Sequence, residues 1–332
     1  MYGPDLIRRS VGFADLIEPV KQSFADFSGG RGESPIVVFA PAGPDGDVHV
    51  KSSWADGRDV FIVKVATWFA ARALGGRPPA SGFMAVHDAT TGDLLALLQD
   101  EHHLTDVRTA AASAVATRLL ARQDAAVLAV LGTGVQAYLQ VLATLAVRPI
   151  DTVIIWGRRE QAAHTLRTAL NAADPSLSIS VARQAEYAVR SADVIVTATG
   201  SRRPILYGDW LRPGQHVTAT GADDRTKTEL DTACFRRADL LAVDSREHAP
   251  AFAGDLHAAT TPVHAEIGEL VLGRAPGRHD PDQITIAKLV GLGIQDLAAA
   301  QTTLRLLESP PADRPRPASG QDLVGSSDRT IP

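Results

Sequence analysis

A glycine-rich turn at residues 132–137 constrains the fold more than any other feature of this sequence. The apolar run Val127–Leu131 leads into Gly132-Thr133-Gly134-Val135-Gln136-Ala137, and a helical pattern follows to about Ala146. In a strand–turn–helix unit the first glycine permits a tight turn, the second lets a pyrophosphate approach the backbone, and the small third residue allows close helix–strand packing. The helix N-terminus adds amide donors and a positive dipole. The turn therefore predicts a dinucleotide site, with Gly132, Thr133, Gly134, Val135 and Gln136 as cofactor-binding residues.

Strand and helix patterns alternate beyond this turn. A helical pattern spans 159–173, and short apolar runs recur before and after it. Alternation at this spacing predicts an α/β fold with a Rossmann-type, doubly wound parallel sheet over residues 117–289. The predicted strands after the turn are Thr152–Trp156, Ile179–Val181, Asp193–Thr197, His216–Thr220 and Leu240–Val243. Residues 284–308 show helical periodicity and no strand pattern.

The first third of the chain has a different pattern. From Val11 to about Leu98, short runs rich in β-branched residues alternate with Gly, Pro and Asp turns, which predicts an antiparallel sheet of hairpins. A buried helical stripe then runs from Thr105, a candidate N-cap, to Arg122. We expect residues 1–116 with 290–308 to form an antiparallel α+β substrate-binding and dimerisation domain, and the proline-rich residues 309–332 to be a disordered tail.

Composition and charge indicate what kind of molecule the protein binds. The 332 residues are 45% hydrophobic and 21% charged, enough for two domains with cores of their own. A net charge of −5 without a Lys/Arg block argues against nucleic acid or an anionic membrane surface, and favours a small-molecule substrate. Cys234 is the only cysteine, and no apolar stretch is long enough to span a membrane, so we expect a cytoplasmic protein.

The end of the second predicted strand bears on the cofactor. NAD-binding units carry an acidic residue there for the ribose 2′-hydroxyl, whereas here Gly157-Arg158-Arg159 follows Trp156 and the first carboxylate is Glu160. Guanidinium groups bind phosphate, so Arg158 and Arg159 favour NADP(H) over NAD(H). The alternative is that both arginines form a solvated first helical turn.

Two cations are candidates for binding a substrate anion. Lys64 lies in the apolar run Asp59–Val65, where it must meet an anion or lose its charge, although it could also extend from a strand end into solvent. Arg108 lies in the first turn of the predicted 105–122 helix, where the helix dipole disfavours a cation unless an anion binds there too.

Acidic and histidine side chains could serve in proton transfer or metal binding. Asp223 and Asp224 follow a predicted strand at its carboxyl end, where ligands bind in open α/β sheets, so one of them could exchange a proton with an amine or imine. Adjacent acids in a loop are otherwise usually solvated. The histidines show no metal-ligand spacing, and we expect no metal site.

Together these motifs resemble the ornithine cyclodeaminase/mu-crystallin family from about Val60 to Leu307. The order and spacing of these motifs are highly specific for that family. The matching segments are Lys64-Val65, residues 104–111, Gly132 to Ala137, Ala192-Asp193 through Thr199, Gly221-Ala222-Asp223, Lys227-Thr228-Glu229-Leu230, Ile284-Thr285, and Gly291 to Leu297.

The resemblance implies roles for the candidates. It implies that Lys64 and Arg108 hold the substrate carboxylate near the nicotinamide and that Asp223 handles protons at the reacting amine or imine, which makes Asp223 and Lys64 the catalytic residues. It implies a homodimer formed through the antiparallel domain. The further cofactor contacts that it implies are Lys227, Thr197 or Thr199, and Ser81.

Departures from the family pattern concern the substrate. Ile36 in Ser34-Pro35-Ile36 stands where cyclodeaminases carry a carboxylate-binding arginine, and Val50 stands where a glutamate helps to recognise ornithine. The pair Gly157-Arg158 suits exchange of NADPH and net reduction, whereas cyclodeaminases keep NAD bound and recycle the hydride.

The sequence therefore predicts an NAD(P)H-dependent oxidoreductase that reduces a C=N bond, as an imine or ketimine reductase or an amino-acid dehydrogenase. Two alternatives stay open. One is an ornithine- or lysine-type cyclodeaminase that releases ammonia and forms a cyclic imino acid. The other is a non-catalytic NADP(H)-binding protein.

Overall fold

The computed structural model describes residues 1–308, and the predicted tail 309–332 lies outside the described residues. The chain divides into two compact units: the first contains residues 1–108 and resumes at Leu292, and the second contains residues 109–291. No helix in the described part is long and apolar enough to cross a membrane.

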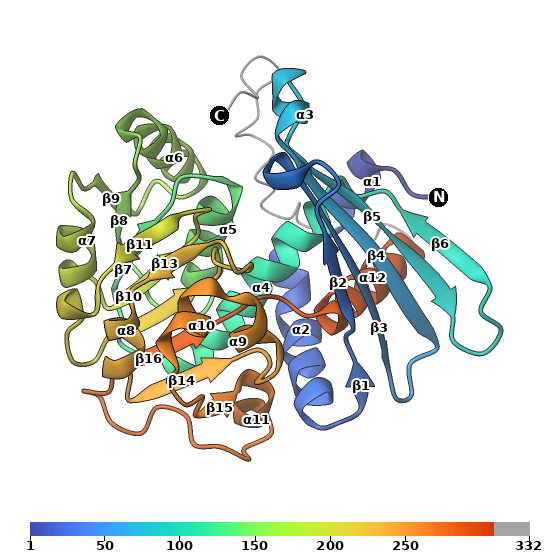
Figure 1. Cartoon of the computed structure of the whole chain (residues 1–332). Helices are drawn as coiled ribbons and strands as arrows, with labels where there is room; N and C mark the ends of the chain where they lie inside the picture. Colours follow the sequence, from blue (N-terminus) through green and yellow to red (C-terminus); the bar gives the residue numbers. More distant parts are fainter. Residues whose placement is uncertain (309–332) are drawn as a thin grey trace. The chain divides into compact units, whose positions relative to one another are not determined.

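An antiparallel six-stranded sheet forms the centre of the first unit (Figure 1). Strand order is β1-β3-β4-β5-β6, and β2 also pairs with β3. Hairpin connections explain the order from β3 to β6, since these neighbours in the sheet are also neighbours in the chain. The strands are β1 (Gly32–Glu33), β2 (Ile36–Phe39), β3 (Gly46–Ala55), β4 (Val60–Phe69), β5 (Ala80–Asp88) and β6 (Leu94–Leu98).

Helices cover one face of this sheet. Helix α12 (Gly293–Glu308) packs on β3 and β4, and α2 (Phe13–Ser28) packs on α12. The prediction of hairpins from residue 11 onward was wrong for residues 13–28, where buried residues recur at helical spacing and include Leu16, Val20 and Phe24. The remaining short helices are α1 (Pro4–Ser10), η1 (Gly43–Asp45) and α3 (Ala70–Leu74).

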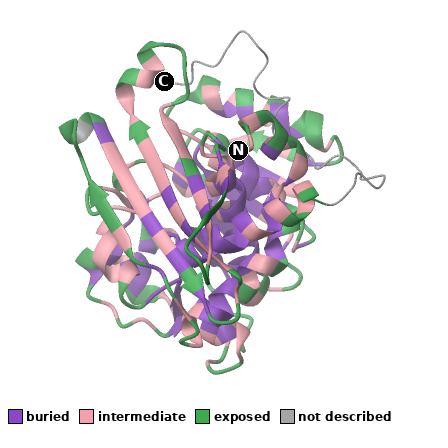
Figure 2. Cartoon of the chain, turned by 90° about the vertical axis from the view of Figure 1, so that its right-hand side faces the viewer, coloured by how far each residue is buried: buried purple, intermediate pink, exposed green. Residues whose placement is uncertain are grey.

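The two faces of the sheet differ in burial, since side chains alternate along each strand. Ile62, Lys64 and Met84 share the inner face that α12 covers, and each is at most 2% exposed. The outer face is apolar yet partly open. Figure 2 shows its strands largely in pink and green, the colours of intermediate and exposed residues.

A parallel eight-stranded sheet forms the second unit, with the order β15-β14-β16-β12-β10-β7-β8-β9. The prediction of a Rossmann-type, doubly wound parallel sheet in one part of the chain and an antiparallel sheet in the other is confirmed. A small two-stranded sheet pairs β11 with β13. The strands are β7 (Val127–Leu131), β8 (Thr152–Trp156), β9 (Ser178–Val181), β10 (Val194–Thr197), β11 (Arg202–Leu206), β12 (His216–Ala219), β13 (Thr228–Leu230), β14 (Leu240–Val243), β15 (Ala265–Glu266) and β16 (Thr285–Lys288).

Helices connect and cover the parallel strands. Helix α5 follows β7, α6 follows β8, and α7 returns the chain to β10 beside β7. The helices are α4 (His103–Leu120), α5 (Val135–Leu145), α6 (Glu160–Ala173), α7 (Ala185–Ser191), η2 (Gly208–Trp210), α8 (Thr232–Arg237), α9 (His248–Phe252), α10 (Gly254–Ala259) and α11 (Ile267–Val271).

Helix α4 begins earlier than the sequence indicated. The predicted N-cap at Thr105 was wrong, because the carboxylate of Asp100 accepts the Leu104 amide at 2.8 Å and the helix begins at His103. Arg108 consequently lies in the second turn rather than the first. The boundary between the two units falls within this helix, after Arg108.

Strand β16 is a second correction. Residues 284–308 were predicted to contain no strand, yet Thr285–Lys288 lies between β12 and β14, with Ile286 fully buried. A four-residue strand that is buried on both faces shows no alternation of polar and apolar residues, so its sequence carries no period-2 signal.

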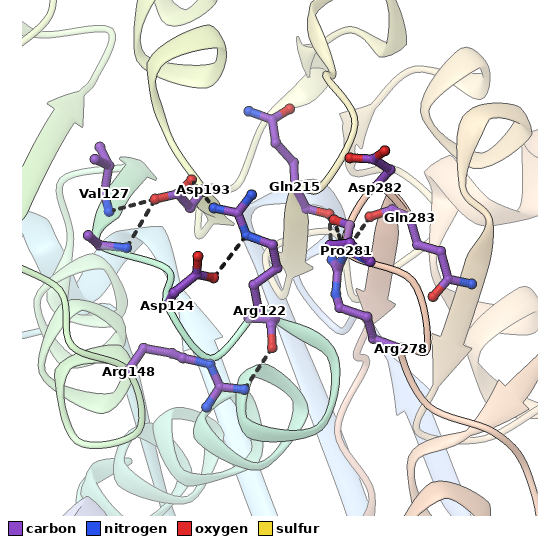
Figure 3. A network of polar contacts seen from close by, with 12 residues as sticks. Arg122, Asp124, Val127, Arg148, Asp193, Gln215, Arg278, Pro281, Asp282 and Gln283 are labelled. Carbon is purple, nitrogen blue, oxygen red and sulfur yellow. Dashed lines mark hydrogen bonds and ion pairs between the residues drawn. The ribbon is translucent and has the colours of Figure 1, made fainter.

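Polar contacts fasten the amino ends of the parallel strands (Figure 3). Asp193 precedes β10, and its carboxylate accepts the guanidinium of Arg122 at 2.9 Å and the amides of Ala126 and Val127 at 3.0 Å. Arg278 donates to backbone carbonyls before β12 and β16, including those of Gln215 and Gln283. Ligands bind at the carboxyl ends of such strands, so this network is structural.

Candidate functional site

The glycine turn lies at the point where the strand order of the parallel sheet reverses. From β7 the chain proceeds through β8 and β9 in one direction, and from β10, the other neighbour of β7, it proceeds in the opposite direction. Dinucleotides bind at such a switch point. Gly132 follows β7 with φ +142°, and a Cβ there would lie 2.5 Å from the carbonyl oxygen of Ala198, so only glycine fits.

The start of α5 fits a phosphate group. Gly134 is the N-cap, no side chain caps the helix, and nothing lies within 4 Å of the position that a Cβ on Gly134 would take. Val135 at the first helical position is 56% exposed. An open helix N-terminus with a glycine at its entrance offers amide donors to an anion. The predicted residues from Gly132 to Gln136 all lie in this turn or the first turn of α5.

The loop after β8 brings the two arginines beside the glycine turn. A Cβ on Gly157 would collide with Cγ2 of Thr133, so the backbone of this loop approaches the glycine turn closely. Arg158 and Arg159 follow directly and are exposed, and Glu160 begins α6. The loop after β8 therefore carries two guanidinium groups, and no carboxylate comes before them in this loop.

A buried glutamate that was not among the predicted site residues fixes the neighbouring loops. Glu229 is fully buried; its carboxylate accepts both hydroxyl groups of Thr197 and Thr199 at 2.8 Å, and the Thr199 amide at 2.7 Å. It also accepts the amides of Gly221 at 2.8 Å and Ala222 at 3.2 Å. One side chain thus joins the loop after β10 to the loop after β12. Thr197 and Thr199, both predicted cofactor contacts, are held by it.

Burial raises the pKa of Glu229, against the opposing charge of Lys288 and the hydrogen bonds from Thr197 and Thr199. Lys288, which ends β16, is itself fully buried and lies 3.3 Å from Asp255. Glu229 belongs to the segment Lys227-Thr228-Glu229-Leu230 that resembles the family, but nothing local in the sequence indicates that its carboxylate is buried.

Asp223 and Lys227 form an ion pair in the loop after β12. Lys227 Nζ lies 2.6 Å from Asp223 and 3.1 Å from Asp224. Burial opposes the charge of Lys227, but the two aspartates raise its pKa above the ordinary lysine value. Asp224 turns to its own loop and accepts the Thr226 amide at 2.7 Å, whereas the Asp223 side chain is 39% exposed. Asp223 is therefore the more accessible of the two acids.

In the first unit, Asp296 joins two of the predicted residues. Its carboxylate lies 2.6 Å from Lys64 Nζ and accepts Nε of Arg108 at 2.9 Å. Lys64 comes from β4, Arg108 from α4 and Asp296 from α12, and all three are at most 5% exposed. Asp296 lies in a segment that resembles the family, but the sequence indicates no role for it, because an aspartate in a helix has no local signal for a partner so distant in the chain.

The charged side chains of Lys64, Arg108 and Asp296 form one cluster, and their charges shift the pKa values of Lys64 and Asp296. Burial, helped by the positive charges of Arg108 and Lys51 and opposed by the attraction of Asp296, lowers the pKa of Lys64 to about 7. Burial would raise the pKa of Asp296, but Lys64, Arg108 and Lys51 hold it at about 2. Asp296 is thus a carboxylate at neutral pH, whereas Lys64 can change its charge near neutrality.

Gln295 adds a buried hydrogen-bond donor to this cluster. Its Oε1 accepts Nη1 of Arg108 at 3.3 Å and the Leu292 amide at 3.4 Å, which fixes the orientation of the amide group. Its Nε2 is buried and has no hydrogen-bond partner in the part of the chain that the structure describes. Leaving a buried donor unpaired is costly, so a ligand with an acceptor oxygen would be stabilised here.

Strand register shows on which face of the sheet Val50 lies. Val50, which the resemblance places where the family has a recognition glutamate, pairs with Val65 on the outer face, away from Lys64. The residue opposite Lys64 on its own face is Lys51, and Ile36 is opposite Lys51. A shift of one position along a strand moves a side chain to the other face of the sheet.

Ser81 belongs to a different unit from the other predicted cofactor residues. It pairs with Thr67 on the outer face of the antiparallel sheet and belongs to the first unit, whereas the glycine turn belongs to the second. Its role in cofactor binding stays a prediction.

Among residues 1–308, no group of three or more His, Cys, Asp or Glu side chains is arranged to hold a metal ion. His102 contacts Asp106 at 3.2 Å, and this carboxylate raises the His102 pKa although burial opposes the charge. His216 hydrogen-bonds to Thr218 and Thr285 inside the second unit, where burial lowers its pKa to about 3.

Comparisons with known proteins identify similar sequences and folds. Residues 7–307 match the model of the ornithine cyclodeaminase/mu-crystallin family. The ketimine reductase mu-crystallin of Mus musculus is 32% identical over 290 residues, which are 86% of this chain and 90% of that protein. The Thermococcus litoralis Δ1-pyrroline-2-carboxylate reductase, solved with NADH and L-proline, has a TM-score of 0.86 at 28% identity and covers 92% of this chain and 96% of its own. An archaeal alanine dehydrogenase dimer with bound NAD has a TM-score of 0.84 at 29% identity, covering 92% and 94%.

Proposed function

The chain belongs to the ornithine cyclodeaminase/mu-crystallin family, and on that premise we propose that it is a nicotinamide-nucleotide-dependent oxidoreductase that reduces the C=N bond of an imine derived from an amino or imino acid. One observation carries the proposal. The carboxyl ends of the adjacent strands β7, β10 and β12 bring together the glycine turn, the threonines held by Glu229, and Asp223 paired with Lys227. This combines a dinucleotide site with a carboxylate that can exchange protons.

The second unit contributes cofactor binding and proton transfer. A bound nicotinamide nucleotide would supply the hydride for the imine carbon and leave oxidised. The open start of α5 would hold the pyrophosphate of the nucleotide, and Glu229 fixes the loop that carries Thr197 and Thr199. Lys227 favours the ionised form of Asp223, so this carboxylate stabilises a protonated imine nitrogen and exchanges a proton with the amine that results.

The first unit contributes anion binding. Lys64, Arg108 and the unpaired Nε2 of Gln295 are buried donors within one cluster. A substrate carboxylate would satisfy these donors, and a bidentate contact with Arg108 would fix its orientation. Asp296 keeps the two cations in position. Binding of this kind contributes to rate through geometry and electrostatics.

We propose NADP(H) in preference to NAD(H). Arg158 and Arg159 are exposed directly after β8, and the first acidic residue there begins α6. Guanidinium groups match a 2′-phosphate, and the missing carboxylate removes the usual partner of a ribose 2′-hydroxyl. The solved relatives named above contain NADH or NAD, so cofactor preference is a separate test.

We also propose a homodimer that forms through the outer face of the antiparallel sheet. Val37 is 59% exposed there, Phe39 49%, Trp54 44% and Phe83 36%, and half-buried valines lie between them. Apolar side chains gathered on one exposed face are typical of an interface. A cytoplasmic location also stays a prediction.

A turnover assay tests the proposed activity. Purified full-length protein is incubated with NADPH or NADH and a panel of cyclic imines and 2-oxo acid/ammonium mixtures, and both cofactor oxidation and free ammonia are measured. We expect net cofactor oxidation and a loss of kcat of about a hundredfold or more in Asp223→Ala, since general acid–base groups contribute about 10²–10⁴-fold. Ammonia release from ornithine or lysine without net cofactor change would instead establish a cyclodeaminase. Cofactor binding without turnover of any substrate would establish a binding protein.

A further inference from the structure

A buried lysine ends the central strand β16 of the parallel sheet. Strand register places Lys288 between Ala219 of β12 and Val243 of β14, at the carboxyl ends of all three strands. Its side chain is fully buried, and its Nζ lies 3.3 Å from Asp255 and has no hydrogen-bond partner in the part of the chain that the structure describes. A buried charge of this kind costs more stability than a well-packed apolar side chain of similar size. The cost points to a role for Lys288 beyond packing.

Asp255 connects Lys288 to strand β13. This aspartate lies in α10 and is fully buried. Its Oδ1 contacts Lys288 and accepts the Leu256 amide at 2.9 Å. Its Oδ2 accepts the amides of Glu229 at 3.3 Å and Leu230 at 3.4 Å. The placement of Glu229 therefore depends on Lys288 through the carboxylate of Asp255.

Glu229 in turn holds the start of the loop 221–227, which carries Asp223 and Lys227. Its carboxylate accepts the amides of Gly221 and Ala222, the two residues directly before Asp223, at 2.8 Å and 3.2 Å. Burial raises the pKa of Glu229, and the charge of Lys288 is the first of the influences that oppose this rise. Amides bind an ionised carboxylate more strongly than a neutral one. Lys288 thus favours the form of Glu229 that holds the loop.

The start of α10 contacts the middle of the same loop. The Gly254 amide donates to the carbonyl oxygen of Asp224 at 3.2 Å. A Cβ on Gly254 would lie 2.7 Å from the carbonyl oxygen of Arg225, so the backbones of the helix and the loop approach closely. Asp255 follows Gly254 directly. Its contact with Lys288 therefore also fixes the helix end against which the loop packs.

We propose that Lys288 and Asp255 are positioning residues for Asp223, which fix the loop 221–227 through Glu229 and through the start of α10. This inference rests on the proposed reductase function, in which Asp223 exchanges a proton with the substrate. Neither Lys288 nor Asp255 needs to touch the substrate or the cofactor for this role. A displacement of a catalytic group by about 1 Å can lower a rate about a hundredfold, so a distant residue that sets its position affects kcat.

The experiment removes the charge of Lys288 and follows both the loop and the reaction. Lys288→Met keeps an unbranched side chain of similar length. Hydrogen–deuterium exchange, followed by mass spectrometry in peptides that cover residues 219–230, reports on the Gly221 and Ala222 amides without any substrate. We expect exchange there to become about tenfold faster. For the imine that wild type reduces best, we expect kcat to fall about ten- to a hundredfold, while KM changes less than about threefold.

Arg278→Met is the matched control, because Arg278 holds the opposite end of the same strand. Its guanidinium donates to the hydroxyl group of Thr285 at 3.0 Å and to the carbonyl oxygen of Gln283 at 2.6 Å, at the amino end of β16. This substitution should lower the thermal stability, whereas exchange in residues 219–230 and kcat should stay as in wild type. Asp255→Asn is the second variant. Its neutral amide cannot form the ion pair with Lys288, and it should reproduce the effects of Lys288→Met.

The outcomes separate this inference from the proposed function. Unchanged exchange and kcat in folded Lys288→Met overturn the positioning role while the reductase function stands. Equal losses of kcat in Lys288→Met and Arg278→Met also overturn it, because a general loss of stability then explains both. Wild type that reduces no imine of the panel overturns the proposed function, and the exchange measurement still decides whether Lys288 holds the loop. Should Lys288→Met fail to fold, unchanged exchange and kcat in Asp255→Asn would overturn the inference.

Discussion

Lys64 and Asp296 form a fully buried ion pair, 2.6 Å apart, although they lie far apart in the chain. Strand β4 and helix α12 bring them together, and Arg108 makes a second contact with the same carboxylate at 2.9 Å. A buried ion pair offsets the loss of hydration only when both partners stay in place. The pair therefore makes the placement of two proposed substrate-binding cations depend on one residue of α12.

Replacement of Asp296 tests this dependence. Asp296→Asn leaves Lys64 and Arg108 buried without a carboxylate, and we expect a loss of about 3–5 kcal/mol in the free energy of unfolding. Urea denaturation followed by circular dichroism measures it. Glu18→Gln, which removes an exposed partner of Lys21, should change stability by less than about 1 kcal/mol. Equal effects of the two substitutions would contradict the role of Asp296.

The pH dependence of substrate binding tests Lys64. Its pKa lies at about 7 in the folded protein, so Lys64 is charged below that pH and neutral above it. We expect KM for a carboxylate substrate to rise as pH increases through about 7, with bound substrate displacing the transition upward because it favours the charged form. Lys64→Arg stays charged throughout and should lose this dependence. A KM that does not change between pH 6 and 9 in wild type would count against the assignment.

The lowered pKa of Lys64 also makes the free energy of unfolding depend on pH. The folded-state pKa lies below the ordinary lysine value of 10.5, so between pH 7 and 10.5 the unfolded chain binds a proton that the folded chain does not. The contribution of Lys64 to the free energy of unfolding therefore increases with pH across that window. Comparing wild type with Lys64→Met over this range, by denaturation at each pH, isolates the contribution.

Replacement of Glu229 tests the loop that follows β10. In Glu229→Gln, one amide group replaces a carboxylate that accepts donors from Thr197, Thr199 and Gly221. Because the amide nitrogen cannot accept them, we expect about tenfold weaker cofactor binding and a stability loss of about 1–3 kcal/mol. Fluorescence titration with NADPH and NADH measures the affinity. The matched control is Glu186→Gln, which removes an exposed partner of Arg190 and should leave cofactor affinity unchanged.

Charge reversal at Arg158 tests the proposed cofactor preference. Arg158→Asp places a carboxylate after β8, where it would repel a 2′-phosphate and accept a ribose 2′-hydroxyl. We expect the ratio of kcat/KM for NADPH over NADH to fall at least tenfold. Arg167→Asp, a change within α6, should leave the ratio as in wild type. Wild type that already prefers NADH would show that the arginines form a solvated helical turn.

A charged residue on the outer face of the antiparallel sheet tests the proposed dimer. Phe39→Lys places a cation where an apolar contact is proposed, and we expect dissociation into monomers, measured by sedimentation velocity. Leu74→Lys replaces another exposed apolar residue, on the short helix α3, and serves as the control. A wild-type protein that sediments as a monomer would overturn the proposed interface.

Local sequence determined much of the fold. The glycine turn, its flanking strand and helix, and the alternation of strands and helices after it predicted the doubly wound sheet, because each depends on residues close together in the chain. The same local patterns missed α2 and β16. Their burial depends on which surfaces cover them, and a short strand buried on both faces carries no alternation.

Residue chemistry made Lys64, Arg108 and Asp223 candidates, since a cation in an apolar run needs an anion and ligands bind at the carboxyl ends of parallel strands, and the family resemblance then implied their roles. Only the tertiary structure decided their partners. Asp296 meets Lys64, Glu229 meets Thr199, and Lys51 rather than Val50 faces Lys64, because helix packing and strand register set these contacts. Register fixes which face each side chain occupies, and no short stretch of sequence specifies it.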